Sequence, residues 1–264
     1  MDTESIVIAS GTILAVSIAF SMVGLGGGVL YVPILLALGV TIYDAVTISL
    51  FVITVMSIST VIIYHRHRAI DWKLALVLEP PTAILAFVGG ILANNIYETA
   101  LILTFAGVLF ITSFLLISPV KDRQAKSSYG WGYWHRGMVD NKYVVHLRGL
   151  IPISTTAGFI AGMVGVSGGV FKLPAMVLIG RVPVRIAIGT SSFMVAITAL
   201  AGLCGHVIGG TFDIVEALPL AAAAFVGGFV GSNISNHIKV PMLNIFIAGI
   251  LFLISIWMVV NTLI

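Results

Sequence analysis

Long apolar stretches separated by short polar loops run from one end of this sequence to the other. In the first half they cover about residues 5–23, 29–39, 44–64, 74–94 and 99–118, and in the second about residues 149–164, 170–180, 186–208, 214–233 and 241–263. Because a backbone in hydrocarbon must pair its own N–H and C=O groups, such stretches predict membrane helices. A membrane β-barrel would alternate apolar and polar residues, and this sequence does not.

A sequence repeat divides the chain into two halves and a linker. Residues 24–33 (GLGGGVLYVP) align with residues 165–174 (GVSGGVFKLP), and shorter blocks further along match in the same order. Ordered matches of this kind indicate a duplication. We therefore expect an all-α polytopic membrane protein with two repeats of about five hydrophobic segments, at residues 1–118 and 149–264, joined by a polar linker at 119–148.

The composition agrees with a membrane protein. Hydrophobic residues make up 59% of the 264 residues and charged residues 9%, whereas soluble proteins carry about 25% charged residues. A chain this apolar would expose too much apolar surface in water, so its expected surroundings are a lipid bilayer. The sequence pI near 9.1 raises nucleic acid as a partner. The basic residues, however, lie in short loops between apolar stretches, which indicates membrane orientation instead.

The charges also predict how the two halves are oriented. Loops rich in Lys and Arg lie on the cytoplasmic side of membrane proteins. If the linker is cytoplasmic, twelve of the 13 Lys and Arg residues fall on that side and both chain termini lie outside. Corresponding loops of the halves then lie on opposite sides, which predicts an inverted repeat of the kind found in several secondary transporters. In a parallel duplication, corresponding loops would lie on the same side of the membrane. No choice of sides would then gather the Lys and Arg residues on one side.

Each half contains a glycine-rich segment between a long apolar stretch and a short one. The short stretch, at about 1.5 Å per residue, reaches about 16 Å, half of the hydrocarbon core. Pro33 and Pro174 follow just beyond and mark the expected helix breaks. We expect a broken-helix hairpin in each half, whose restarting helix presents free N–H groups and a positive dipole end to an anion. The alternative is close helix packing, which we prefer for the pairs Gly89-Gly90 and Gly227-Gly228.

Polar side chains beside the hairpins complete the expected substrate site. Lys172 is an intramembrane cation, for which a functional role is the default and snorkelling the alternative; Tyr31 is its counterpart in the first half. The nearby hydroxyls either donate to substrate oxygens or bond back to helix carbonyls. The expected substrate-binding residues are Gly26, Gly27, Gly28, Ser49, Ser167, Gly168, Gly169, Lys172, Thr190, Ser191 and Ser192.

Two other titratable residues are candidates for proton coupling. Glu79 precedes Pro80-Pro81 and carries a coupling proton if burial favours its neutral form; a solvated helix start is the alternative. His206 ends an apolar stretch on the expected outer side and is a candidate for a gate or proton role. A coupling proton and a coupling sodium ion both remain open. No cluster of His, Cys, Asp or Glu has the spacing of metal ligands, and no cofactor is expected.

The glycine-rich blocks ending in Val-Pro and Leu-Pro, with residues 45–49 (AVTIS) and 187–192 (AIGTSS), resemble the TauE/SafE family of sulfite and organosulfonate exporters. The resemblance spans nearly the whole chain apart from the linker, and the second copy is the closer match. It implies a multi-pass transporter in a bacterial or archaeal plasma membrane that exports sulfite, sulfoacetate or a related small sulfur-containing anion by alternating access. A homodimer is an open option. The first copy departs from the pattern where Thr-Ile-Ser replaces Gly-Thr-Ser.

Two other classes of function compete with a transporter. Residues 165–168 (GVSG) match the nucleophile pattern of intramembrane serine proteases, with Ser167 as nucleophile and His206 as base. In the repeat, however, Gly26 corresponds to Ser167. The serine side chain is therefore an addition to a backbone motif that both halves share. We therefore expect no catalytic residue and no enzyme activity. An anion channel is the nearer rival, and saturable, gradient-dependent flux would distinguish a transporter from it.

Overall fold

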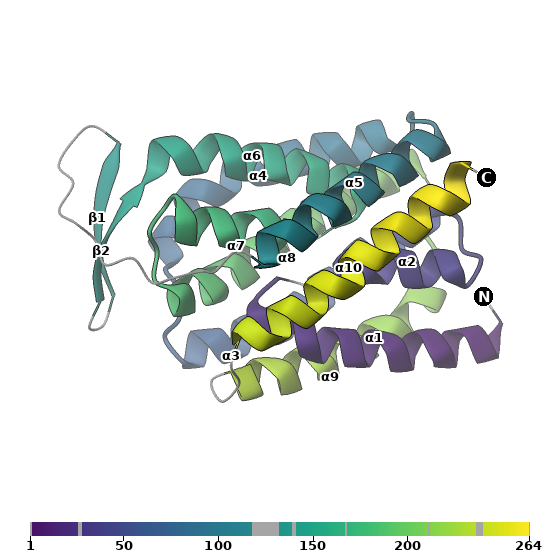
Figure 1. Ribbon diagram of the computed structural model, residues 1–264, viewed down its shortest axis with the longest axis horizontal. Helices are drawn as coiled ribbons and strands as arrows, with labels where there is room; N and C mark the ends of the chain where they lie inside the picture. The colour runs from purple at the N-terminus through teal and green to yellow at the C-terminus, as the bar shows by residue number, and fades with distance from the viewer. Residues whose placement is uncertain are drawn as a thin grey trace.

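The computed structural model describes residues 2–25, 28–117, 132–138, 141–166, 168–210, 212–235 and 240–263. These residues form a bundle of helices, with a β-hairpin at one end (Figure 1). In the first half the helices are α1 (Thr3–Val23), α2 (Gly28–Ala37), α3 (Ile42–Arg66), α4 (Trp72–Ala93) and α5 (Glu98–Ile117). In the second half they are α6 (Leu147–Val164), α7 (Gly169–Leu178), α8 (Val184–Gly209), α9 (Ile214–Ile234) and α10 (Val240–Leu263).

The predicted class, an all-α polytopic membrane protein, is confirmed. Among the described residues, eight helices are long and apolar enough to cross a membrane, and α2 and α7 are shorter apolar helices of ten residues each. Polar side chains begin several of the long helices. The side chains of Thr41, Asp71 and Asp213 accept backbone N–H groups in the first turns of α3, α4 and α9, which stabilises those ends.

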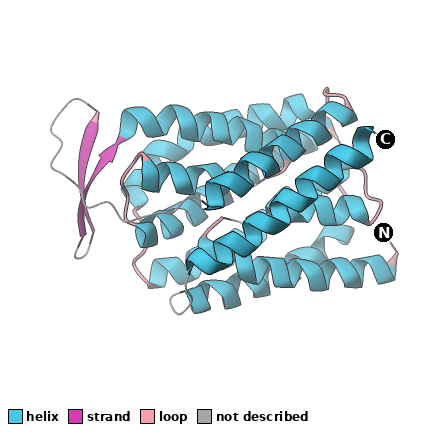
Figure 2. Cartoon of the chain, in the orientation of Figure 1, coloured by secondary structure: helices cyan, strands magenta, loops and turns pink. Residues whose placement is uncertain are grey.

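One element was not predicted. Within the linker, β1 (Tyr133–Met138) and β2 (Asn141–His146) pair antiparallel, with Tyr133 opposite His146 and Met138 opposite Asn141 (Figure 2). The hydropathy pattern that indicates membrane helices carries no signal for two short polar strands. The hairpin leads directly into α6, because His146 ends β2 and Leu147 begins the helix.

The two halves begin at opposite ends of the bundle. Figure 1 shows both chain termini at one end and the β-hairpin at the other. Helix α1 starts beside the termini, whereas its counterpart α6 starts beside the hairpin. The short helices follow the same rule, with α2 toward the terminal end and α7 toward the hairpin end.

Each half contributes one helix to the packing of the other. Helix α4 packs mainly against α6 and α8, whereas α9 packs mainly against α1 and α3. Glycines make these contacts close. A Cβ atom on Gly90 would lie 2.5 Å from the carbonyl oxygen of Gly202, and one on Gly227 would lie 2.7 Å from that of Leu14. The packing role expected for Gly89, Gly90, Gly227 and Gly228 is therefore confirmed.

Candidate functional site

The helix breaks fall at two glycines with left-handed backbone. Gly24 (φ 70°) ends α1 and Gly165 (φ 74°) ends α6, a conformation that costs glycine little because it has no Cβ. Pro33 and Pro174, the expected break points, instead lie inside α2 and α7. Helix α2 begins at Gly28 and α7 at Gly169, ahead of both prolines, so the glycines rather than the prolines interrupt the helices.

The two glycine turns contact the opposite halves in a reciprocal way. The Ser49 hydroxyl on α3 donates to the Gly165 carbonyl at 3.0 Å, and the Ser191 hydroxyl on α8 donates to the Gly24 carbonyl at 3.2 Å. Ser49 and Ser191 are counterparts in the repeat, as are the two glycines. These hydroxyls thus hold the turns in place.

The turns also touch each other inside the protein. A Cβ atom on Gly169 would lie 2.9 Å from the carbonyl oxygen of Leu25, so the start of α7 packs on the first turn. Leu25 and Val166, next to the two turns, are both buried. The breaks therefore lie in the interior of the bundle, where irregular backbone is tolerated because it is covered by protein.

A buried ion pair lies beside the second turn. The Lys172 ammonium on α7 donates to Glu79 Oε2 on α4 at 2.9 Å, and both residues are buried, at 0% and 4% exposure. Lys172 also donates to the Thr198 hydroxyl on α8, which in turn donates to Glu79 Oε1 at 2.5 Å. The three side chains form a closed triad that joins α4, α7 and α8.

The Lys172 side chain points back toward the start of its own helix. A Cβ atom on Gly168 would lie 3.6 Å from Lys172 Nζ, so the ammonium lies over the first turn of α7. The ammonium and the positive end of the α7 dipole therefore act on the same small region. The Glu79 carboxylate lies there now. A region that holds a carboxylate in this way has the charge and donors that another oxyanion needs.

The structure places the other expected binding residues around the turns rather than in the triad. Gly28, Gly168 and Gly169 lie at the starts of α2 and α7. Thr190 Oγ1 accepts the backbone N–H of Asp71 at 3.0 Å, and the Ser192 hydroxyl donates to its own helix at Ile188. Gly26, Gly27 and Ser167 lie outside the described residues.

The two proton candidates lie in different surroundings. Glu79 is not at a helix start, because α4 begins at Trp72 and remains helical through Pro80-Pro81. His206 is 1% exposed near the C-terminal end of α8, where its Nε2 lies 2.9 Å from the Gly162 carbonyl oxygen and its Nδ1 has no partner among the described residues. In the first half its counterpart Tyr64 donates to the carbonyl of Ser21 in the same way. His206 therefore takes part in a packing contact that both halves share.

Comparison with known proteins bears on what the site does. A family model described as sulfite exporter TauE/SafE matches residues 9–258. The chain belongs to the TauE/SafE family. The probable membrane transporter protein YunE of Bacillus subtilis is 26% identical over 89% of this chain and 90% of its own length. A probable membrane transporter protein of Methanocaldococcus jannaschii is 24% identical over 92% of this chain and 91% of its own length. No solved structure gave a significant match.

Membership of the TauE/SafE family confirms the resemblance seen in the sequence. Together with the eight apolar helices, it makes this chain a multi-pass membrane transporter. The names of these relatives give no substrate. In the part of the chain that the structure describes, no three His, Cys, Asp or Glu residues are grouped as metal ligands.

The first half of this TauE/SafE protein has a neutral version of the triad. Tyr31 corresponds to Lys172 in the repeat, and Met56 corresponds to Thr198. The Tyr31 hydroxyl lies 2.6 Å from Ser17 Oγ and donates to Met56 Sδ at 3.0 Å. The duplication has therefore kept the contact between these two positions, while of the four residues only Lys172 carries a charge.

A second ion pair lies at the hairpin end. Like the Glu79–Lys172 pair, it was not predicted from the sequence. The Arg136 guanidinium on β1 contacts both oxygens of Asp71, with Nε at 2.9 Å from Oδ2, and the Tyr143 hydroxyl on β2 donates to Oδ2 at 2.5 Å. Burial raises the pKa of Asp71, but the hydrogen bonds from Arg136, Tyr143 and the Leu74 N–H outweigh it, so the pKa lies below its ordinary value. Burial and the bond to Asp71 raise the pKa of Tyr143.

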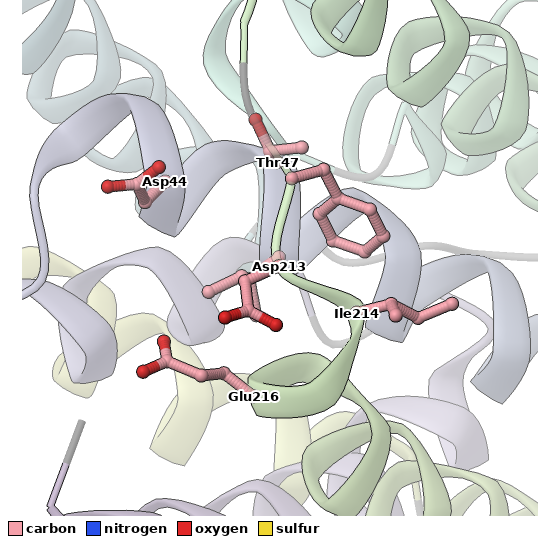
Figure 3. Close-up of a pocket in the computed structure, with 7 residues that line it drawn as sticks. Asp44, Thr47, Asp213, Ile214 and Glu216 are labelled. Atoms are coloured by element: carbon pink, nitrogen blue, oxygen red, sulfur yellow. The ribbon is translucent and has the colours of Figure 1, made fainter.

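A cavity of about 530 Å³ opens at the other end of the bundle. Acidic side chains from both halves line it: Asp44 on α3, Asp213 just before α9 and Glu216 on α9 (Figure 3). Thr47 also lines this cavity, two residues before Ser49 on the same helix. The acidic cavity therefore lies on the terminal side of the glycine turns, whereas Asp71 and Arg136 lie on the hairpin side.

Proposed function

We propose that this protein is a secondary transporter that exports a small sulfur-containing anion, such as sulfite, sulfoacetate or a similar organosulfonate, across the plasma membrane by alternating access. One observation carries the proposal: the Lys172 ammonium is fully buried beside the second of two touching glycine turns and is already paired with a carboxylate. A buried ammonium is costly, and a site for an anionic substrate gives that cost a function.

Three kinds of group in this region suit an oxyanion. Lys172 supplies charge-assisted donors. The start of α7 supplies backbone N–H groups and the positive dipole end, and α2 starts three residues after Leu25, on which the start of α7 packs. The proposed site accordingly includes residues 26–28, residues 167–169 and Lys172, with Ser49, Thr190, Ser191 and Ser192 positioning the backbone around it.

The arrangement of the halves supports an alternating-access mechanism. Corresponding helices start at opposite ends of the bundle, and the serine contacts at the two turns are reciprocal. We infer an inverted repeat whose two related conformations open the site to either side in turn. In our orientation the hairpin end is cytoplasmic, because Lys and Arg gather there, and both termini lie outside.

Transport by reconstituted protein tests the proposal. We expect saturable uptake of labelled sulfite, methanesulfonate or sulfoacetate into proteoliposomes, and much weaker uptake of acetate and phosphate. The Lys172→Ala variant lowers the flux at least about tenfold, because it removes the charge that holds the anion. The matched control Lys73→Ala, at an exposed lysine in the first turn of α4, leaves the flux near that of wild type.

Two results would contradict the proposal. One is an equal effect of the two lysine variants in protein that elutes as a single folded species. The other is flux that rises in proportion to concentration without saturating, which would indicate a channel. In the present conformation Lys172, Glu79 and Thr198 are bonded to one another, an arrangement that suits a closed substrate site better than an open pore.

A further inference from the structure

We propose that Glu79 and Lys172 form a combined site for a proton and an anion. One proton binds Glu79 each time one singly charged sulfur oxyanion binds Lys172, and the two cross together. This inference rests on the proposed function and adds to it the coupling ion, the stoichiometry and the charge of the substrate.

The geometry of the triad sets up the exchange. In the present conformation both Glu79 oxygens are engaged, Oε2 by Lys172 and Oε1 by Thr198. An anion that reaches Lys172 must therefore replace the Glu79 carboxylate as partner of the ammonium. The displaced carboxylate stays buried on α4, next to the incoming anion. It also stays negatively charged unless it takes up a proton.

Charge balance decides whether the proton is needed. With the site empty, the Lys172 cation and the Glu79 anion sum to zero. With an anion bound and Glu79 ionised, the buried site carries a net negative charge, which is costly away from water. With an anion bound and Glu79 protonated, the sum is zero again. A doubly charged anion would leave a net negative charge even with Glu79 protonated. Of the anions proposed above, the site therefore takes the singly charged ones, a monosulfonate or hydrogensulfite, and not sulfoacetate, which carries two charges at neutral pH.

Of the ionisable side chains described on the surrounding helices, Glu79 is the acid that contacts Lys172. Helices α6 and α8 pack against α4, and α7 packs against α6 and α8 and reaches Glu79 through Lys172. His206 on α8 packs by its backbone near Gly90, about three turns farther along α4, and its ring bonds Gly162 on α6. Asp71, before the first turn of α4, is held by Arg136 and Tyr143. The remaining charged side chains on these helices, Lys73, Arg148 and Arg185, lie in their first turns.

Coupling of this kind makes transport electroneutral. Both the empty and the loaded site cross without net charge, so the membrane potential does not drive the cycle. The direction of net flux follows the sum of the anion gradient and the pH gradient. A high internal concentration of the anion then drives export, with one proton leaving for each anion.

The wild-type protein provides the first test. Purified full-length protein is reconstituted with a pH-sensitive dye in the lumen, and inward gradients of methanesulfonate and 2-hydroxyethanesulfonate are applied; hydrogensulfite is run in parallel. The two sulfonates stay ionised at neutral pH, so any proton that enters with them comes through the protein. We expect one proton per sulfonate and an uptake rate, for all three probes, that is unchanged when the membrane potential is clamped at different values.

The Glu79→Gln variant provides the second test. Glutamine keeps the shape of the side chain but cannot release a proton, so the empty site carries the unbalanced Lys172 charge. We expect exchange of labelled for unlabelled sulfonate to continue, while net uptake and lumen acidification fall at least tenfold. The matched control Glu98→Gln, at an exposed carboxylate in the first turn of α5, retains exchange, net uptake and acidification.

The outcomes separate this inference from the proposed function. No flux of any sulfur oxyanion through wild-type protein would overturn both. Sulfonate uptake without acidification, hydrogensulfite uptake that scales with the potential, uptake confined to doubly charged anions, or undiminished acidification by Glu79→Gln would overturn only the coupling. If Glu79→Gln does not fold, as judged by size-exclusion chromatography, the wild-type stoichiometry and voltage dependence still decide the question.

Discussion

At the scale of single residues, charge distinguishes two positions that the duplication would otherwise make equivalent. Tyr31 and Lys172 occupy corresponding places in the repeat. Their partners, Met56 and Thr198, also correspond to each other. Only Lys172 brings a full charge, and only Lys172 meets a carboxylate. A neutral tyrosine is cheap to bury, whereas an ammonium requires a partner. The chemistry of the proposed site therefore belongs to the second turn, and the first turn supplies backbone and packing.

Asp71 allows a prediction about pH at the same scale. Its folded pKa is depressed, so it stabilises the fold above its unfolded pKa of about 3.9, and this contribution is lost as the pH falls through the folded pKa. The Asp71→Asn variant should lose about 3 kcal/mol at neutral pH, because the partly buried Arg136 loses its partner. Thermal unfolding followed by tryptophan fluorescence in detergent measures the difference.

The pH profile provides the control for this prediction. The gap between wild type and Asp71→Asn should be largest between pH 6 and 7 and should shrink as the pH falls below about 4, where Asp71 of the unfolded chain takes up a proton before Asp71 of the folded protein does. A gap that stayed constant down to pH 3 would show that the carboxylate charge does not hold the β-hairpin against α4.

At the scale of elements, close helix packing depends on glycines whose missing Cβ another backbone occupies. A Cβ atom on Gly162 of α6 would overlap the backbone of Ala86 on α4. The Gly162→Ala variant should therefore separate the two helices and lower the yield of folded protein severalfold. Gly107→Ala on α5 is the matched control, because a Cβ atom there meets nothing within 4 Å. Equal yields of monodisperse protein from the two variants would contradict this packing account.

The sequence predicted these elements better than it predicted their partners. Hydropathy located the long helices, and the glycine-rich blocks located the two turns, because both signals are local. The Glu79–Lys172 pair joins positions 93 residues apart, through a helix that packs into the opposite half. Thr198 is a single hydroxyl in an apolar stretch, and no local sequence signal marks it as a partner of Lys172. The partnership of Asp71 with Arg136 and Tyr143 depends on a β-hairpin that the polar linker did not reveal.

At the scale of the whole molecule, opposite charges gather at the two ends of the bundle. The acidic cavity formed by Asp44, Asp213 and Glu216 lies at the end that we place outside. Its negative potential should lower the local concentration of anions and so oppose their return after export. The double variant Asp44→Asn with Glu216→Gln should lower the apparent KM for anion uptake from the outer side a few-fold at low salt.

Salt dependence checks the electrostatic origin of that effect. The difference in KM should shrink toward nothing near 0.5 M salt, because salt screens the attraction or repulsion between the exposed cavity carboxylates and an approaching anion. A difference that persisted at high salt would point to a change in the shape of the cavity. A rise in KM would contradict the assignment of this end as an exit for anions.

The central claim is that the buried Lys172 ammonium, beside the second of two touching helix breaks, holds the transported anion. Its most direct test is anion-dependent thermal stabilisation of purified protein, in which a ligand at 100 times its Kd adds about 2.7 kcal/mol to the folded state. Methanesulfonate or sulfite should raise the melting temperature of wild type and Lys73→Ala in a saturable way, and should leave Lys172→Ala unchanged. The same saturable rise in Lys172→Ala would contradict the account.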